Sequence, residues 1–250
     1  MLLSRHKLIS ATFPIRVDID NDIVIVDASA GSSHICAVDS LGRVLSWGNN
    51  ELMQCGCENA DGSDPLISKA TVIPDLSDIV SVACGSAHTI CLTQNGSVVV
   101  FGDNRDGQLG LSAQITSSKP TTPTLPCRIK QVCAGSRFSL LLGEDGNVYM
   151  SGTFNDEVHY SFTVVLSDVD GGIQQIYAGG NSCAAVSNLN KLYMWGEHVF
   201  GSDESFVYTP QLIPSDINFQ VITMGVSHTC LLSTCDATSD LHPPLNLNWE

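Results

Sequence analysis

Residues 79–110 read IVSVACGSAHTICLTQNGSVVVFGDNRDGQLG, and the rest of the chain repeats this stretch. It holds three β-rich runs, Ile79–Val82, Thr89–Leu92 and Val98–Phe101. Gly85 separates the first two runs, Asn95-Gly96 separates the second from the third, and Gly102 ends the third. The Asn-Gly pair predicts a hairpin turn of type I′, which needs positive φ at both central residues. Three such runs between glycine turns predict most of one antiparallel sheet.

The same register of glycines recurs along the chain. The turn glycines are Gly31, Gly85, Gly135, Gly179 and Gly225, spaced 54, 50, 44 and 46 residues apart, with apolar residues six and three positions before each. Eleven residues after the first four stand Gly42, Gly96, Gly146 and Asn190, and seventeen residues after them stand Gly48, Gly102, Gly152 and Gly196. Asn is the residue that best replaces Gly at positive φ. A period near 50 residues, built from strands and glycine turns, predicts a propeller blade or another closed β array.

The pattern V-x-C-G-S-x-H-T-x-x-L, followed by G-x-V-x-x-F/W-G-x-N-x-x-G-Q-L-G, resembles the repeat of the RCC1 (regulator of chromosome condensation 1) family, and residues 82–110 carry it most fully. The resemblance implies an all-β, RCC1-like β-propeller of about five repeats of roughly 50 residues. The repeat cores are 25–56, 79–110, 129–160, 173–204 and 219–233. Because family members resemble seven-bladed rings, the array is incomplete, and we expect an open arc whose ends the N-terminal segment, a partner or a second copy covers.

The repeat array is expected over residues 22–233, flanked by an N-terminal strand or tail at 1–21 and a C-terminal tail at 234–250. Residues 57–78 and 111–128 contain several prolines and are predicted to be loops between the units. Asp18–Asp22 begins like a calcium loop but lacks the glycine and glutamate that such a loop needs, so a solvated turn is expected.

The chain is acidic, with 11 Lys and Arg against 26 Asp and Glu and a net charge of −15. No basic run exists to contact phosphates, so direct nucleic-acid binding is not expected. Several of the ten cysteines occupy strand positions of the repeat, where cysteine acts as a small buried hydrophobe. We find no signal peptide and no apolar stretch of 18 residues, and therefore expect free thiols, a cytoplasmic or nuclear protein and no membrane insertion.

No enzyme signature emerges from the motifs. His34, His88 and His228 each lie three residues after a turn glycine, and this repetition predicts that each imidazole packs and hydrogen-bonds inside its own blade. Cys55-x-Cys57 lacks a second pair at zinc-site spacing, and no phosphate loop is present. We therefore expect no catalytic residue, no metal and no cofactor.

The loops after Gly48, Gly102, Gly152 and Gly196 leave the repeat at one point and should share one face. Loops on a rigid scaffold are where recognition commonly lies. The candidate partner-binding residues in them are Asn49, Asn50, Asp103, Arg105, His159 and His198. The first functional hypothesis is a protein-interaction scaffold that binds a protein partner through this face. The resemblance implies two alternatives: a guanine-nucleotide exchange factor for a small Ran-like GTPase, or a substrate-recognition part of a ubiquitin ligase or kinase.

Overall fold

The computed structural model describes residues 17, 19, 22–57, 65–112, 116–197, 199, 206–214 and 218–234. These residues form strands and turns, with no helix among them. The strands are β1 (Ile25–Ala30), β2 (His34–Asp39), β3 (Val44–Asn49), β4 (Leu66–Val72), β5 (Ile79–Cys84), β6 (His88–Thr93), β7 (Val98–Gly102), β8 (Ser117–Thr121), β9 (Ile129–Ala134), β10 (Phe138–Gly143), β11 (Val148–Phe154), β12 (Glu157–Leu166), β13 (Ile173–Gly179), β14 (Ser182–Ser187), β15 (Leu192–Glu197), β16 (Phe206–Ile213), β17 (Asn218–Met224) and β18 (Thr229–Thr234).

The strands form four four-stranded sheets and one two-stranded sheet, all antiparallel. We call them blade 1 (β1–β4), blade 2 (β5–β8), blade 3 (β9–β12), blade 4 (β13–β16) and blade 5 (β17–β18). Within each complete blade the spatial order of the strands follows the chain, so every connection inside a blade joins neighbouring strands. The predicted all-β propeller class is confirmed.

The turns between the second and third strands of blades 1 to 4 share one shape. Gly42, Gly96, Gly146 and Asn190 have φ of 74°, 80°, 83° and 58°. In blade 2 the Gly96 N–H donates to Thr93 O at 3.0 Å, and the Thr93 N–H donates to Ser97 O at 2.9 Å. Asn95 does not have positive φ, so the predicted type I′ turn is wrong. The loop spans Gln94 to Gly96 and forms a type I turn that ends in a left-handed residue.

A fourth strand lies at the outer edge of blades 1 to 4. β4 and β8 fall within 57–78 and 111–128, which the prolines had led us to predict as loops. Pro120 lies in β8 and Pro210 in β16, and an edge strand tolerates proline because its outward N–H has no strand to pair with. In blade 3 a two-residue turn at Asn155-Asp156, with φ of 46° and 64°, joins β11 directly to β12.

The apolar core lies between neighbouring blades. One cluster joins blades 1 and 2, another joins blades 2 and 3, and a third extends through blades 3, 4 and 5. The residue six positions before the turn glycine packs toward the preceding blade, and Ile79, Ile129 and Ile173 are at most 2% exposed. On β1, where no described blade precedes, the equivalent residue Ile25 is only half-buried. The contacts that stabilise each blade therefore come from its neighbours.

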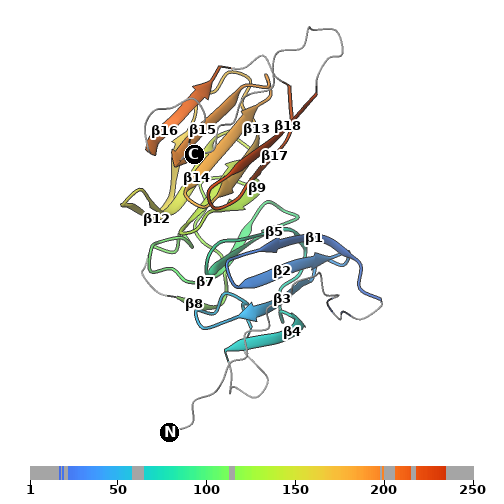
Figure 1. The fold of residues 1–250 in the computed structure, drawn as a ribbon. Coiled ribbons are helices and arrows are strands. Elements are labelled where there is room, and N and C mark those ends of the chain that lie inside the picture. Colours follow the sequence, from blue (N-terminus) through green and yellow to red (C-terminus); the bar gives the residue numbers. More distant parts are fainter. Residues whose placement is uncertain are drawn as a thin grey trace.

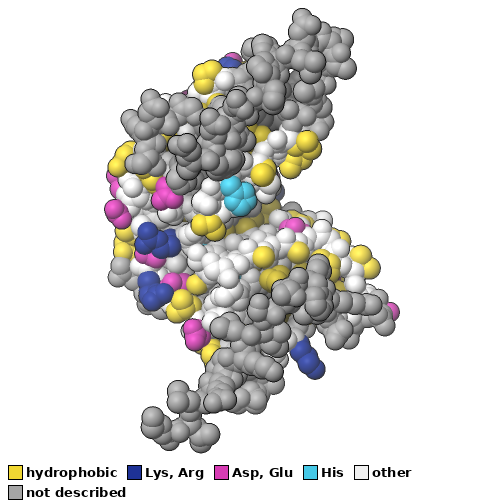
Figure 2. All heavy atoms as spheres, in the orientation of Figure 1, with side chains coloured by type: hydrophobic (Ala, Val, Ile, Leu, Met, Phe, Trp, Pro, Cys, Tyr) yellow, Lys and Arg dark blue, Asp and Glu magenta, His cyan; other side chains and the backbone are white. Residues whose placement is uncertain are grey.

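The five blades form an open arc (Figures 1 and 2). The first strands of consecutive blades pack on one another, from β1 through β5, β9 and β13 to β17. The opening lies between β1 and the β17–β18 hairpin, where Figure 2 shows a hollow in the surface. Val221 and Leu232 of that hairpin are 51% and 56% exposed. The predicted tails at 1–21 and 234–250 fall almost wholly outside the described residues.

Substitutions in the hairpin turns can separate the need for positive φ from crowding. A Cβ at Gly146 would lie 3.7 Å from its nearest neighbour, whereas a Cβ at Gly96 would lie 3.0 Å from Arg128 Cβ. We expect Gly146→Val to lower the free energy of unfolding by about 1–2 kcal/mol, because β-branched residues are poor at positive φ, and Gly96→Val to lower it further.

Gly146→Asn is the matched control, because Asn190 occupies the same turn position in blade 4. We expect its free energy of unfolding to lie within about 0.5 kcal/mol of wild type. Urea denaturation measures all three variants. Equal stabilities for Gly146→Val and Gly146→Asn would contradict the turn geometry.

Candidate functional site: the loop face

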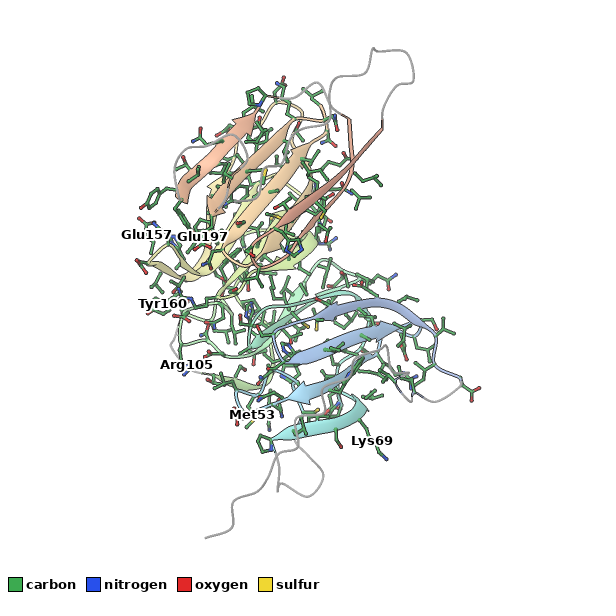
Figure 3. All side chains as sticks on the ribbon, viewed as in Figure 1. Met53, Lys69, Arg105, Glu157, Tyr160 and Glu197 are labelled. Carbon is green, nitrogen blue, oxygen red and sulfur yellow. The ribbon has the colours of Figure 1, made fainter. Side chains whose placement is uncertain are left out.

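The segments that follow the third strands of blades 1 to 4 emerge on one side of the arc. We call this side the loop face and define it by residues 50–57, 103–112, 155–160 and Glu197. Figure 3 shows Met53, Arg105, Tyr160, Glu157 and Glu197 along this side, from blade 1 to blade 4. The glycines that precede these segments, Gly48, Gly102, Gly152 and Gly196, have φ of 111°, 105°, 109° and 107°. A side chain at any of them would meet the backbone of the adjacent second strand, so glycine is required where the third strand ends.

Buried amide side chains shape the loops of blades 1 and 2. In blade 1, Asn50 Oδ1 accepts a hydrogen bond from the Cys55 N–H at 2.8 Å, and Gln54 Oε1 accepts one from the Leu52 N–H at 2.9 Å. The same bonds in blade 2 join Asn104 to Leu109 at 2.8 Å and Gln108 to Asp106 at 2.9 Å. The N-x-x-x-Q spacing of the repeat therefore fixes the backbone of each loop and leaves the tip side chains facing solvent.

A hydroxyl group of blade 2 ties the blade 1 loop to a histidine. Thr89 Oγ1 lies 2.9 Å from His34 Nε2 and donates its proton to Gln54 O at 2.8 Å. All three residues are at most 2% exposed. Because the hydroxyl proton goes to the carbonyl, His34 Nε2 is the donor to Thr89, which sets the ring tautomer. We call this arrangement of histidine, hydroxyl and loop carbonyl the inter-blade staple.

The staple recurs between blades 2 and 3. Ser139 Oγ lies 3.2 Å from His88 Nε2 and donates to Gln108 O at 2.5 Å. The sequence predicted that each histidine hydrogen-bonds inside its own blade, and this is wrong for His34 and His88. The position three residues after the turn glycine faces the following blade, so the ring reaches across the interface.

The staple histidine of blade 2 is uncharged. Burial in the interface, with a smaller contribution from His34, lowers the pKa of His88 to about 3. The neutral ring can therefore serve as a single-proton donor at physiological pH.

Three of the predicted partner-binding residues help to build the loops. Asn50 and Asp103 are only 4% and 5% exposed. Asn49 Oδ1 accepts hydrogen bonds from the Glu51 N–H at 2.9 Å and from Gln54 Nε2 at 3.0 Å. Their polar atoms are thus engaged within the protein.

The other three candidates lie in different settings. The Arg105 side chain is 65% exposed, and its Nε and Nη2 donate to the Asp103 carboxylate at 2.9 and 2.8 Å. Burial would raise the pKa of Asp103, but the hydrogen bonds from Arg105 hold that pKa below its usual value. His159 is half-buried in β12 rather than in a loop, and His198 lies outside the described residues.

Sequence reasoning missed an ion pair that connects two units of the loop face. Arg137 Nη1 of blade 3 lies 3.9 Å from Asp106 Oδ1 of blade 2, and the two side chains are 50% and 32% exposed. Arg137 follows the turn glycine by two residues, a position that no repeated motif marks.

The structure contains two groups of buried cysteines, one in the blade 1 loop and one between blades 1 and 2. Cys55 and Cys57 are buried with Ile67 in a small apolar cluster. His34, Cys36 and Cys84 bring one possible metal-ligand atom each within 4.8 Å of one another. Sequence spacing does not reveal this cluster, because Cys84 follows Cys36 by 48 residues and belongs to the next blade.

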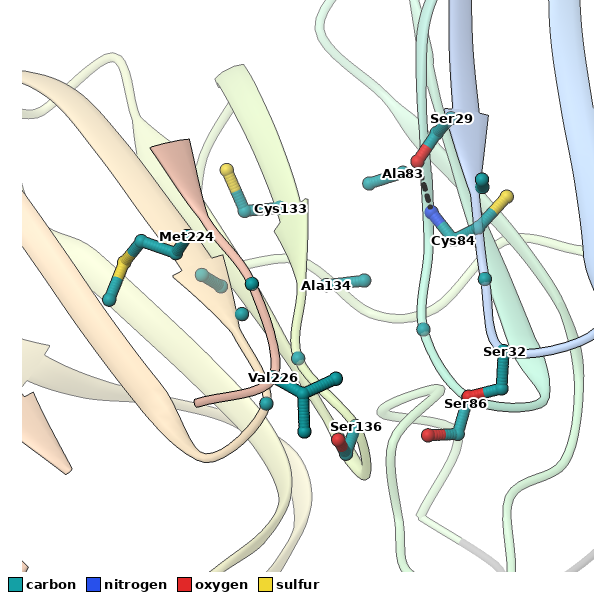
Figure 4. A pocket seen from close by; sticks show the side chains of 18 of the residues that line it. Ser29, Ser32, Ala83, Cys84, Ser86, Cys133, Ala134, Ser136, Met224 and Val226 are labelled. Atoms are coloured by element: carbon teal, nitrogen blue, oxygen red, sulfur yellow. Dashed lines mark hydrogen bonds between the residues drawn. The ribbon is translucent and has the colours of Figure 1, made fainter. Parts of the chain in front are cut away.

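The first strands of the five blades line a central cavity of about 420 Å³ (Figure 4). Its lining consists of glycines, alanines, valines and Met224, with the serines Ser29, Ser32, Ser86 and Ser136 and the cysteines Cys84 and Cys133. Among its lining residues there is no carboxylate, histidine or basic side chain.

The described part of the chain holds no helix long and apolar enough to span a membrane.

Comparisons with known proteins identify the repeat. A sequence profile described as "Regulator of chromosome condensation (RCC1) repeat" matches residues 25–57, 79–108 and 129–157, and a second profile of that description matches 42–92 and 95–142. Together they cover just over half of the chain.

Several curated proteins are similar to this chain in sequence. The mouse "RCC1-like G exchanging factor-like protein" is 25% identical over 249 residues, which are 88% of this chain and 53% of the relative. Human "E3 ubiquitin-protein ligase HERC2" is 29% identical over 240 residues, 88% of this chain and 5% of the ligase. The chain thus spans about half the length, or less, of these curated relatives.

Two solved structures are similar in fold. The crystal structure of human WBSCR16 gives a TM-score of 0.80 at 19% identity and covers 94% of this chain and 64% of that one. The structure of Prp20p from Saccharomyces cerevisiae, described with its binding properties to Gsp1p and histones, gives a TM-score of 0.75 at 22% identity and covers 89% and 59%.

Ser139→Ala tests the staple between blades 2 and 3. The variant removes the acceptor of His88 Nε2–H and the shorter of the hydrogen bonds to Gln108 O. We expect it to lower the free energy of unfolding by about 1–3 kcal/mol, because a buried donor is left without a partner. The control is Ser167→Ala, whose exposed hydroxyl bonds only to Asp168. Similar urea midpoints for the two variants would argue against the staple.

The buried histidine should also make the protein sensitive to acid. The pKa of His88 is about 3 in the folded state, below its ordinary value of 6.5, so the unfolded state binds the proton first. Stability is therefore lost as the pH falls below about 6.5. His88→Phe removes this titration, and phenylalanine already holds the equivalent position as Phe138.

Urea midpoints measured for both proteins between pH 7 and 4 provide the test. We expect the wild-type free energy of unfolding to fall more steeply than that of His88→Phe, by up to about 1.4 kcal/mol per pH unit. Parallel curves would show that folding does not lower the pKa of His88.

Proposed function

The chain belongs to the regulator of chromosome condensation (RCC1) repeat family, and from this membership we propose that it is a protein-interaction scaffold that binds a protein partner through the loop face. The proposal includes no catalytic residue, no cofactor and no direct contact with nucleic acid. It places the protein in the cytoplasm or the nucleus.

One observation carries the proposal: the loops are rigid while charged side chains at their tips face solvent. Buried Asn and Gln side chains fix the loop backbones, and the staple anchors Gln54 and Gln108 beneath them. The exposed Arg105 guanidinium is held in place by a buried carboxylate. A surface ordered before binding loses little conformational entropy on association, so its contacts contribute more to affinity.

The charge of the chain favours a protein partner over nucleic acid. The net charge is −15, Arg105 on the loop face pairs with Asp103, and Arg137 pairs with Asp106 of that face. Phosphate backbones require unpaired basic groups for affinity. A partner that presents both carboxylates and basic groups suits the mixed charges of this face.

A guanine-nucleotide exchange factor for a small GTPase is the second candidate. It is supported by the name of the mouse relative and by the description of Prp20p with Gsp1p. A substrate-recognition part of a ubiquitin ligase is the third, supported by similarity to HERC2. A nucleotide-release assay with a panel of small GTPases separates the second candidate from the others, and we expect no acceleration of release.

Site-specific cross-linking tests the loop face with a matched control. Arg105 on the loop face and Arg43 in the blade 1 hairpin turn each pair with a buried aspartate, Asp103 and Asp39, but they lie at opposite ends of their blades. A photo-reactive residue at position 105 should capture a protein partner, and one at position 43 should not. Capture only at position 43, or equally at both, would contradict the proposal.

The variants Arg105→Glu and Arg43→Glu supply a quantitative comparison once the partner is purified. We expect Arg105→Glu to weaken binding by about tenfold or more, because charge reversal at an interface costs on the order of 1.4 kcal/mol or more. We expect Arg43→Glu to bind as wild type does. Equal affinities for both variants would remove the loop face as the binding surface.

A further inference from the structure

Three potential metal ligands from two blades meet in the interface between blades 1 and 2. His34 and Cys36 lie on β2, and Cys84 ends β5. One ring nitrogen and two sulfur atoms lie within 4.8 Å of one another. The exposed fractions of the three residues are 2%, 0% and 8%. A buried group of one imidazole and two thiols is the donor set that proteins use for soft or borderline metal ions.

The hydroxyl of Thr89 lies beside the same group. Its Oγ1 is 2.9 Å from His34 Nε2, 3.7 Å from Cys36 Sγ and 3.9 Å from Cys84 Sγ. A regular tetrahedron with edges of about 3.8 Å has its vertices about 2.3 Å from its centre, which is the Zn–S bond length. The distances of 3.7 and 3.9 Å from Thr89 Oγ1 to the two sulfur atoms are close to this edge, whereas the 2.9 Å to His34 Nε2 is the length of a hydrogen bond.

The neighbouring interface shows that the staple does not need the cysteines. Between blades 2 and 3, His88 and Ser139 form the staple, and the positions of Cys36 and Cys84 are taken by Ile90 and Ala134. An apolar pair therefore suffices to pack this part of an interface. Packing alone therefore does not explain why cysteines, rather than apolar residues, occupy these two positions between blades 1 and 2.

We propose that His34, Cys36 and Cys84 bind a zinc ion between blades 1 and 2. Two thiolates cancel the charge of Zn²⁺, so the bound site is neutral overall and costs little to bury. Carboxylates, which would favour magnesium or calcium, are not among the ligand atoms of the cluster. The ion would join β2 of blade 1 to β5 of blade 2.

Binding releases the thiol protons in a balanced exchange. Zn²⁺ forms bonds to Cys36 Sγ, Cys84 Sγ and a ring nitrogen of His34. Each sulfur that is protonated gives one H⁺ to solvent, and a ring that binds through Nε2 carries its proton on Nδ1 instead, with no change of oxidation state. A hydrogen bond between the two thiols raises the pKa of Cys36 and lowers that of Cys84, although burial opposes the second effect. Zinc affinity should therefore rise with pH.

The ion has a route to the site. Cys84 lines the central cavity, which is open to solvent at the gap in the arc (Figures 2 and 4). In Figure 4, Cys84 lies on the cavity wall, and its backbone N–H is bonded to Ser29 of the adjacent blade at 3.0 Å. Of the three ligand residues, Cys84 lines this cavity, whereas His34 and Cys36 do not.

Metal analysis of the full chain tests the proposal. The wild-type protein, purified without a metal-affinity tag, should carry about one zinc ion per chain. Cys84→Ala and Cys36→Ile copy the residues of the next interface, so each should fold while its zinc content falls to background. Cys183→Ala is the control, because Cys183 is fully buried in blade 4 and lies outside the cluster.

Cobalt provides a second readout that needs no variant. Addition of Co²⁺ to the metal-free wild-type chain should produce a thiolate-to-cobalt absorption band, which Cys183→Ala keeps and Cys84→Ala loses. Wild-type protein that takes up neither zinc nor cobalt would overturn the proposal. Unchanged metal content in Cys84→Ala and Cys36→Ile, or a Cys36–Cys84 disulfide in protein kept without reductant, would also overturn it.

Discussion

A hydroxyl group shared between two neighbouring blades is the interaction on which the array depends. Thr89 and Ser139 each accept a hydrogen bond from a histidine of the preceding blade and donate one to a loop carbonyl of that blade. The staple thus sets the position of one blade against the next and holds the loop in place at the same time. Because the apolar core also lies between blades, a blade without its neighbour lacks both its core and its polar anchor.

Blade 5 shows the staple histidine where no described blade follows it. The ring of His228 lies against Gly225 as His34 lies against Gly31 and His88 against Gly85. His228 is nevertheless exposed, whereas the other two are buried. Val221 and Leu232 beside it are also exposed. The open end of the arc therefore presents the same side chains that join blades elsewhere in the structure.

Much of the fold could be predicted from residue spacing, since glycine positions report backbone geometry directly. The regular distances from Gly85 to Gly96 and Gly102 located two turns and three strands of every complete blade. The fourth strand was missed because Pro120 and Pro210 point to loops unless the strand is known to lie at an edge. The turn type predicted at Asn95-Gly96 was wrong because an Asn-Gly pair also fits a three-residue loop, in which only the glycine needs positive φ.

The site was less predictable, because its properties arise from contacts between blades. Asn50 and Asp103 are polar loop residues of the kind that commonly bind partners. In the structure both are buried, and their side chains hydrogen-bond within their own loops. The reach of His34 to Thr89, 55 residues later, and the meeting of Cys36 with Cys84 depend on how the blades are arranged. Small-angle scattering of the purified chain tests that arrangement most directly. The account predicts a profile that fits a crescent with an open side, and a compact, closed disc with a central channel would contradict it.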